Sequence, residues 1–449
     1  MANSNLTHTA SAGNQKTWTF SAWVKRSNLG AISYLYNQGS AGNTFVSIYI
    51  NSDDTFRCYN ETSSNQTLYF VTNRLFRDTS AWYHIVVQCD TTQATESDRF
   101  KIWINGSQET SFSSASYPAQ NSDTNMNVNS TVQRIGVYNA SGSNANHYWD
   151  GYMSHVALVD GAAVAPTVFG ETNSTSSIWK FKSPSGVTWG TNGFHLKFEN
   201  SGALGTDSSG NTNTFTVNGN LKQALDTPSN VYATLNPLVK QGSTLSNGNN
   251  TSAYGSGSWK SVIATLGMET GKFYYEAKLV SGSAGQLGVA SSKDNGGYAT
   301  TESGALGNSS GCLSVNFGDG SVQTDGGSGG TAQGFTVSAG DIVGCAVDMT
   351  NSKIYWSKNG VWGNSSNPAT GANATTIATG LTNFLPLLPA ISVNNSTIST
   401  NFGNGFFGTT AVTSNSGAGE QDDAGQGKFQ YDVPSGYYAL NTKNINTYG

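Results

Sequence analysis

The sequence predicts an all-β protein built as two tandem antiparallel β-sandwiches, and three observations support this prediction. Apolar and polar residues alternate over many short stretches, as in strands with one buried face, whereas helical periodicity is almost absent. Glycine is abundant at 53 residues and proline is scarce at 9, which is typical of many strands joined by tight turns. Aromatic residues make up 11% of the 449-residue chain, and disordered chains of similar polarity lack them.

The clearest strand patterns lie near the start of the chain and in its second half. Residues 17–24 read TWTFSAWV, which places Trp18 and Phe20 on one face of a strand. Residues 272–280 read KFYYEAKLV and alternate in the same way. Both stretches predict half-buried antiparallel strands.

Two predicted strand pairs, one in each half of the chain, share the same sequence pattern. Residues 82–108 read WYHIVVQCD, a polar break and then FKIWINGSQ. Residues 341–362 read DIVGCAVDM, a short break and then KIYWSKNGVW. Each pair leads into Asn-Gly, the strongest short hairpin signal, because both residues tolerate positive φ. The shared pattern indicates two copies of one architecture rather than one large sheet.

Polar, turn-rich stretches predict the domain organisation. The best boundary is residues 241–252, QGSTLSNGNNTS, whose only apolar residue is Leu245. In order, we expect a sandwich at 1–165, a β-rich connector at 166–250, a second sandwich at 251–410, and a Gly/Ser linker with an aromatic C-terminal tail at 411–449. Residues 193–216 either close the first sandwich or begin a small unit of their own.

Charge and hydropathy exclude several classes of partner. Charged residues make up 11% of the chain, against roughly 25% in an average soluble domain, and the net charge is −5. No basic run occurs, so nucleic acid is not an expected partner. The start, MANSNLTHTA, is not a signal peptide, and no apolar stretch reaches the length of about 18 residues typical of a membrane span. We therefore expect synthesis in the cytoplasm and no membrane insertion.

The four cysteines, Cys58, Cys89, Cys312 and Cys345, form no C-x-x-C pair. Cys89 and Cys345 lie in apolar strand-like runs, where cysteine acts as a small hydrophobic residue. We expect reduced structural cysteines, with a disulfide as the alternative.

Three motifs in the first half of the chain resemble the laminin-G-like, concanavalin-like lectin/glucanase domain: TWTFSAWVKRS, WYHIVVQCD with KIWINGS, and DGYMSHVALVDG at 150–161. Four motifs in the second half resemble, in order, a SPRY domain: GKFYYEAKL, LGVASS, GDIVGCAVDMTNSKIYWSKNGVW and NFGNGFF. The segment DTPSNVYATLNPL at 226–238 resembles a link between these two domain types in virion proteins of tailed phages, marine ones especially. The resemblance implies two concanavalin-like sandwiches, or jelly rolls.

The same resemblance implies a non-enzymatic protein of the phage virion surface, either a capsid decoration (knob) or a subunit of a tail or head fibre. The expected partners are other virion proteins, a host-surface glycan, and further copies of the chain, with a trimer as the expected homo-oligomer. Two alternatives remain: a glucanase-like glycan depolymerase, and a lectin that belongs to no virus.

Candidates for catalysis and for metal binding are weak. Glycosidases of this fold place carboxylates on one face of a strand, and the nearest candidate, Glu96 with Asp98, lies in a polar loop instead. The five histidines show no metal-ligand spacing. Since laminin-G-like domains sometimes hold calcium, Asp53, Asp54 and Asp150 are loose candidates for that ion, although Asp-rich turns more often cap local hydrogen bonds.

Exposed aromatics among small polar residues are the best candidates for sugar binding, because sugars stack their apolar ring faces on aromatic rings. The loop VYNASGSNANHYWD at 137–150 offers Tyr138 and Tyr148, whereas Trp149 is expected in the core. Tyr298 in a polar loop and Trp362 after the second Asn-Gly are the candidates in the SPRY-like half. We expect the ligand to contact loops rather than sheet faces.

Overall fold

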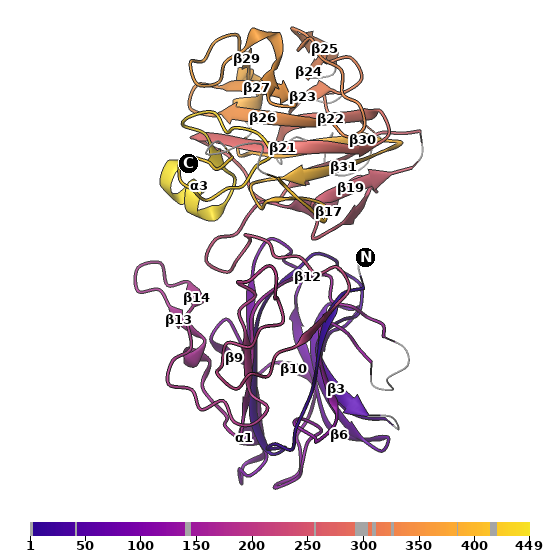
Figure 1. The fold of residues 1–449 in the computed structure, drawn as a ribbon, viewed down its shortest axis with the longest axis vertical. Helices are drawn as coiled ribbons and strands as arrows, with labels where there is room; N and C mark the ends of the chain where they lie inside the picture. The colour runs from indigo at the N-terminus through magenta and orange to yellow at the C-terminus, as the bar shows by residue number, and fades with distance from the viewer. Residues whose placement is uncertain are drawn as a thin grey trace. The chain divides into compact units, whose positions relative to one another are not determined.

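The computed structural model describes residues 3–40, 43–139, 145–255, 257–291, 304–307, 311–324, 327–383, 385–413 and 420–449 (Figure 1). These residues form several antiparallel sheets with only short helical turns, which confirms the all-β prediction. The chain divides into two compact units, residues 1–223 and 224–449. Each unit is a β-sandwich and is described by itself.

Unit 1 pairs an eight-stranded sheet with a six-stranded sheet. In spatial order, the eight-stranded sheet contains β10 (Phe112–Ser116), β6 (Asn65–Leu75), β5 (Thr55–Thr62), β4 (Thr44–Ile50), β3 (Ser33–Ser40), β11 (Val132–Ile135), β1 (Asn5–Thr9) and β16 (Thr216–Asn218). The six-stranded sheet contains β15 (Phe194–Leu196), β12 (Gly151–Asp160), β2 (Thr17–Arg26), β7 (Tyr83–Asp90), β8 (Phe100–Ile104) and β9 (Ser107–Glu109). The turns α1 (Glu96–Arg99) and η1 (Pro166–Val168) and the hairpin of β13 (Gly170–Thr172) and β14 (Trp179–Phe181) complete the unit.

The core of unit 1 lies between these two sheets. Phe20 of β2 and Val87 of β7 come from the six-stranded sheet, and Ile48 of β4 and Phe70 of β6 come from the eight-stranded sheet. All four are buried, because alternate residues of each strand point to the same side. The alternation read from the sequence is therefore confirmed for the core side. The expected half-burial of residues 17–24 is wrong, because both faces of β2 are buried from Trp18 to Arg26.

Residues 166–223 belong to unit 1. β15 pairs with β12, and β16 pairs with β1, so the chain returns to both sheets after residue 190. Residues 193–216 thus help to close the first sandwich, which was one of the two alternatives left open by the sequence. Around β13 and β14, Phe169 and Trp189 pack with Val86 and Val159 on the outer side of the six-stranded sheet.

Unit 2 pairs a seven-stranded sheet with a nine-stranded sheet. The first contains β17 (Leu235–Lys240), β20 (Lys260–Ala264), β30 (Leu387–Asn394), β22 (Ala284–Ser291), β23 (Cys312–Asn316), β24 (Val322–Thr324) and β25 (Gly327–Gly330). The second contains β18 (Thr244–Ser246), β19 (Thr251–Tyr254), β31 (Ser396–Asn401), β21 (Lys272–Ser281), β26 (Ile342–Asp348), β27 (Lys353–Lys358) and β28 (Val361–Trp362), with β29 (Thr375–Thr376) on β27 and β34 (Tyr438–Ala439) on β21. A small hairpin of β32 (Phe406–Phe407) and β33 (Thr410–Ala411) and the turns η2 (Gly363–Ser365), α2 (Thr379–Thr382) and α3 (Thr442–Tyr448) complete the unit.

The segment expected to be a connector is divided between the two units. The division falls between Gln223 and Ala224, and residues 241–252 contain β18 and the start of β19. The polar stretch read as a boundary is the tip of a hairpin in unit 2. This stretch has the polar composition of a linker, but Asn249 and Asn250 are buried, and their carbonyl groups accept hydrogen bonds from the N–H groups of Leu235 and Thr400.

The C-terminal segment packs on the outer side of the nine-stranded sheet. Phe429, Tyr437 and Ala439 share a cluster with Tyr274 and Tyr355, and β34 pairs in parallel with β21. The tail was expected as a strand and an extended piece. It forms the short strand β34 and then the short helix α3, whose N-cap residue Asn441 accepts, through its side chain, a hydrogen bond from the N–H of Asn444.

A buried carboxyl group holds this segment in place. Glu276 of β21 is fully buried and accepts hydrogen bonds from the backbone N–H groups of Gln430 at 3.0 Å and Tyr431 at 2.9 Å. Asn401 Nδ2 and the hydroxyl of Tyr274, both at 3.2 Å, donate to the same group. Burial raises the pKa of Glu276 to about 7, against the opposing effect of these hydrogen bonds.

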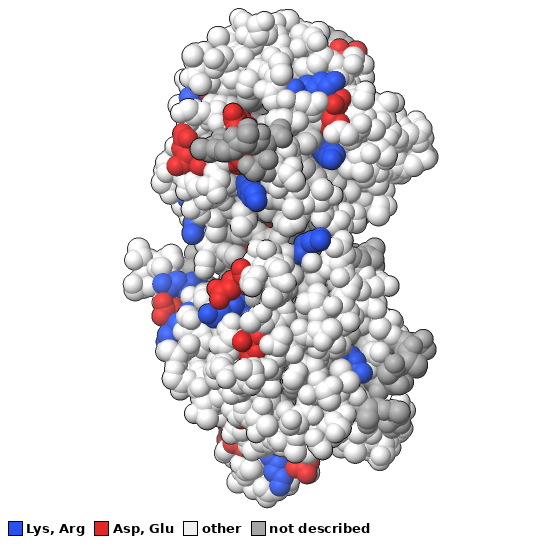
Figure 2. Space-filling view, in the orientation of Figure 1, with Lys and Arg blue, Asp and Glu red and all other residues white. Residues whose placement is uncertain are grey.

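The surface is sparsely charged, as the composition predicts. Figure 2 shows Lys, Arg, Asp and Glu as scattered small groups on the visible face, with no extended patch of one sign. The four cysteines are buried, and no disulfide joins any two of them. Among the described residues, none of the helices has the length and apolar character needed to span a bilayer.

Candidate functional site

The side of the eight-stranded sheet that faces away from the core carries a row of tyrosines. Ile48, Cys58 and Phe70 point into the core. Their strand neighbours Tyr49 and Tyr59 therefore point away from it, because side chains alternate along a strand. Tyr69 lies directly opposite Tyr59 in the pairing of β5 with β6 and joins them on this side.

The rings on this side touch in an unbroken series. Tyr49 stacks on Tyr34 with ring centroids 4.6 Å apart, and Tyr34 contacts Tyr138 at 4.8 Å. Phe45 bridges Tyr138 at 5.8 Å and Tyr59 at 5.6 Å. Tyr59 meets Tyr69 edge to face at 5.4 Å, and His147 lies over Tyr34 at 6.1 Å. We call this group the tyrosine face: Tyr34, Phe45, Tyr49, Tyr59, Tyr69, Tyr138 and His147.

The members of the tyrosine face differ in exposure. Tyr34 and Phe45 are buried at 9% and 7% exposure and form a floor. Tyr49, Tyr59, Tyr69 and Tyr138 are half-buried, and His147 is exposed. The face thus presents the ring surfaces of Tyr49, Tyr59 and Tyr69 to solvent from sheet strands, so a flat apolar ligand can stack on them.

Polar groups border the rings. Arg57 Nη2 pairs with Asp53 Oδ2 at 2.5 Å, and Arg57 Nη1 donates to the hydroxyl of Tyr69 at 3.1 Å. The hydroxyl of Tyr59 donates to Glu61 at 2.5 Å, and burial, together with this acceptor, raises the pKa of Tyr59 to about 12. Burial also raises the pKa of Tyr49. These two tyrosines therefore stay neutral near pH 7, with hydroxyl groups that both donate and accept hydrogen bonds.

The residues expected to bind ligand fall in different places. Tyr138 lies in the tyrosine face, whereas Tyr148 is half-buried and outside it. Trp149 is half-buried and packs against the core of unit 1, as expected. Tyr298 lies outside the described residues.

Sequence reasoning missed the strand tyrosines. No pattern within any one strand singles out Tyr34, Tyr49, Tyr59 and Tyr69, because each strand alone shows only one or two tyrosines. Pairing β3 with β4 and β5 with β6 brings the four together. The repeated tyrosine at alternating positions of neighbouring predicted strands is the signal that could have found them.

Trp362 lies in unit 2 at a shallow hollow of about 590 Å³. Phe335 and Val361 also line this hollow, together with polar residues such as Asn359 and Asn364. Trp362 is half-buried and meets Tyr274 edge to face at 6.4 Å, while Val361 is 74% exposed. The hollow is a secondary candidate for contact with a ligand.

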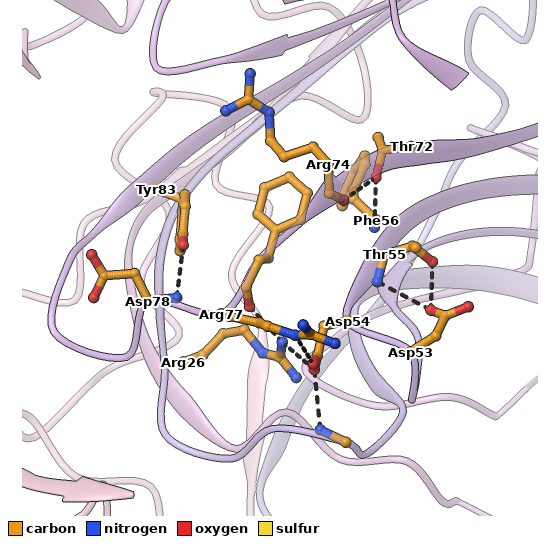
Figure 3. A network of polar contacts seen from close by, with 12 residues as sticks. Arg26, Asp53, Asp54, Thr55, Phe56, Thr72, Arg74, Arg77, Asp78 and Tyr83 are labelled. Carbon is orange, nitrogen blue, oxygen red and sulfur yellow. Dashed lines mark hydrogen bonds and ion pairs between the residues drawn. The ribbon is translucent and has the colours of Figure 1, made fainter. Parts of the chain in front are cut away.

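Asp54 pairs with Arg26 and Arg77, and Asp53 beside it accepts hydrogen bonds from Thr55 (Figure 3). Asp54 Oδ1 accepts from Arg26 Nη1 at 2.8 Å, and its Oδ2 accepts from Arg77 Nε at 2.9 Å. Asp53 is partly desolvated, which acts to raise its pKa, but hydrogen bonds from Thr55 outweigh this effect and hold the pKa at about 2.

This network does not fit the calcium site considered for Asp53 and Asp54, because guanidinium groups already occupy both carboxylates. At Asp150, burial raises the pKa of the carboxyl group. Within the described ranges, no group of three or more His, Cys, Asp or Glu side chains could hold a metal ion.

The weak catalytic candidates lie at the surface. Glu96 and Asp98 belong to the single turn α1, and both are exposed. Asp98 pairs with Lys101 at 2.8 Å. A glycosidase instead needs two carboxyl groups that flank one bond, and this turn does not supply that geometry.

Comparison with known proteins gives one family match. Residues 2–169 match the family model described as the Concanavalin A-like lectin/glucanases superfamily, of laminin-G type. The tyrosine face lies wholly within these residues. No curated protein matches the chain.

Several solved structures are similar to parts of the chain. The SPRY domain of human HERC1 is 17% identical and covers 37% of this chain and 96% of its own, with a TM-score of 0.28. A SAP-like pentraxin from Limulus polyphemus is 14% identical and covers 41% of this chain and 82% of its own, with a TM-score of 0.30. A candidate carbohydrate-binding protein from Bacteroides ovatus is 14% identical and covers 48% of this chain and 56% of its own, with a TM-score of 0.34.

Proposed function

We propose that this protein binds carbohydrate through the tyrosine face without catalysing a reaction. The single observation that carries the proposal is the unbroken series of rings from Tyr49 to Tyr69, which runs over four neighbouring strands and through Tyr138 of an adjoining loop. Aromatic faces bind the apolar faces of sugar rings, and the bordering hydroxyl and carboxylate groups bind sugar hydroxyls. The match of residues 2–169 to a superfamily of lectins and glucanases supports this reading.

Binding is favoured over hydrolysis because the acidic groups at the tyrosine face are already engaged. Asp53 pairs with Arg57, and Glu61 accepts from Tyr59. The low pKa of Asp53 suits a group that stays ionised, not a general acid. The alternative, a glucanase-like depolymerase, predicts release of reducing sugar, and the same preparations can be assayed for it.

The test is a glycan array probed with the full chain and with Tyr49→Ala and Tyr69→Ala. We expect the wild type to bind a defined set of glycans and both variants to lose most of this signal. Tyr448→Ala is the matched control, because Tyr448 is a 40% exposed tyrosine of unit 2. Binding that is undiminished in both variants, or binding to no glycan, would contradict the proposal.

We further propose that the protein acts on the surface of a phage particle, as a capsid decoration or a fibre subunit, where it contacts host-surface glycan. The motifs and the linking segment that resemble phage virion proteins support this. A homo-oligomer, with a trimer as the expected form, would raise the avidity of weak sugar sites by about 10² to 10⁴.

Two measurements test the virion proposal. Antibodies against the chain, carried on gold, should label purified particles in electron micrographs, and light scattering should give a multiple of the chain mass. Unlabelled particles would rule out the virion role, and a monomer both in solution and on the particle would rule out the trimer.

A further inference from the structure

A second hollow, of about 440 Å³, lies in unit 2 at one end of the nine-stranded sheet. Its lining comes from four strands that are neighbours in the order β18-β19-β31-β21. The lining residues are Gly242, Thr244, Ala253, Tyr254, Gly255, Ser281, Asn395, Ser396 and Thr397. Adjacent strand ends thus meet at one place, and the volume falls in the range of about 300–1,000 Å³ typical of small-molecule sites.

Two backbone segments approach each other closely beside this hollow. The pairing of β21 with β31 shifts register between Leu279 and Ser281, which is a bulge that re-aims the strand end. Gly282 follows with φ +83°, and a Cβ there would lie 2.3 Å from the carbonyl oxygen of Asn395. Only glycine permits this close approach, so the turn after β30 and the end of β21 are held together at the wall of the hollow.

The side chains that line the hollow carry no charge. Thr244, Ser281 and Thr397 carry hydroxyl groups, and Asn395 carries an amide. Tyr254 supplies the aromatic ring, with Lys260 Nζ 5.3 Å from its centroid. One ring among hydroxyl and amide groups fits an uncharged sugar, since no carboxylate lines the hollow and Lys260, which lies outside the lining, is held over the Tyr254 ring.

We infer that this hollow is a second carbohydrate site that takes one or two units of a neutral sugar. This second site goes beyond the proposed function, because the site lies in unit 2 and shares no residue with the tyrosine face. The chain would then carry two different sugar sites.

The experiment uses the full chain and uncharged sugars: glucose, galactose, mannose and N-acetylglucosamine, with saturation-transfer NMR as the readout. Ser281→Trp fills the hollow from an exposed position at its rim, so the fold of unit 2 should be kept. Val280→Trp is the matched control, since Val280 is also exposed, at 47%, but does not line the hollow. Both are made in the wild type and in the Tyr49→Ala, Tyr69→Ala double variant.

In the double variant, we expect residual sugar binding that Ser281→Trp weakens by about tenfold or more and Val280→Trp leaves unchanged. Loss of all binding in the double variant would overturn the second site and leave the tyrosine face standing. Wild-type binding that is insensitive to the double variant but lost in Ser281→Trp would support the second site and remove the first. Residual binding unaffected by Ser281→Trp would overturn the inference.

Discussion

The carboxyl oxygen Oε1 of Glu276 lies 2.9 Å from the backbone nitrogen of Tyr431 and links β21 to the C-terminal segment. Burial raises the pKa of this carboxyl to about 7 in the folded protein, above the ordinary value of 4.5. The folded state therefore holds an extra proton between these two pH values. Its stabilising contribution is full below about pH 4.5 and is lost as pH rises through about 7.

We expect the unfolding free energy of unit 2 to fall by up to about 3 kcal/mol between pH 4.5 and pH 8, on the scale of a shift of this size. Urea denaturation at a series of pH values measures it. In Glu276→Gln this dependence should disappear, and the protein should be less stable at low pH, because the new amide turns an N–H₂ group toward donors. Glu171→Gln, at an exposed ion pair with Lys180, is the control. An unchanged pH slope in Glu276→Gln would show that this carboxyl is not responsible.

Asp54 is expected to contribute strongly to the stability of unit 1. Its side chain is 7% exposed and that of Arg26 is 1% exposed, so Asp54→Ala leaves a buried guanidinium without its counter-charge. The expected loss is about 3–5 kcal/mol in the unfolding of unit 1. Asp98→Ala removes an exposed pair with Lys101 and should cost no more than about 1 kcal/mol. Equal effects of the two variants in chemical denaturation would contradict this reading.

Two buried tryptophans should anchor the two cores. Trp18 and Trp356 are 1% and 0% exposed, and each donates its indole N–H, to Thr124 and to the carbonyl of Leu287 respectively. Trp18→Ala and Trp356→Ala should each destabilise their own unit by about 3–5 kcal/mol. Trp103→Ala should cost less, because Trp103 is only half-buried on the outer side of the six-stranded sheet. Calorimetry that resolves the two units would test both the size and the location of each effect.

Tyr138 should matter for binding and little for folding. It is half-buried and contacts Tyr34 and Phe45 from a segment outside the sheet strands. Tyr138→Ala should weaken glycan affinity by about tenfold, and Tyr138→Phe should keep most of it. Titration calorimetry on a glycan found by array measures the affinity, and the melting temperature serves as the control. A fully active Tyr138→Ala would place the ligand elsewhere on the sheet.

The sequence was sufficient for the elements whose signal is local. Asn105-Gly106 and Asn359-Gly360 adopt the positive φ angles that a tight turn needs, between β8 and β9 and between β27 and β28. The alternation around Trp18 and Phe273 placed the correct residues in the cores. Such patterns are readable because a strand with one buried face has a period of two.

The sequence was insufficient where the structure depends on distant partners. The short strand β16 gains its place only by pairing with β1, and the tyrosine face arises only when β3 to β6 align in register. The polar hairpin tip after β18 has the composition of a linker. In each case the local sequence pattern does not differ from that of an ordinary loop or solvated strand.

The position of β34 near the C-terminus affects when the two units can fold during synthesis on the ribosome. Strands β1 and β16 give unit 1 all its sheet partners by residue 218, so it can fold while synthesis continues. In unit 2, β21 can pair with β34 only after Tyr438 and Ala439 have been made. The carboxyl group of Glu276 likewise lacks its two backbone donors until residues 430 and 431 have been made. The outer side of the nine-stranded sheet therefore stays uncovered until residue 439 has emerged. During that interval Tyr274 and Tyr355 lack the C-terminal residues that bury them, so we expect the second half of the chain to need more protection from aggregation than the first.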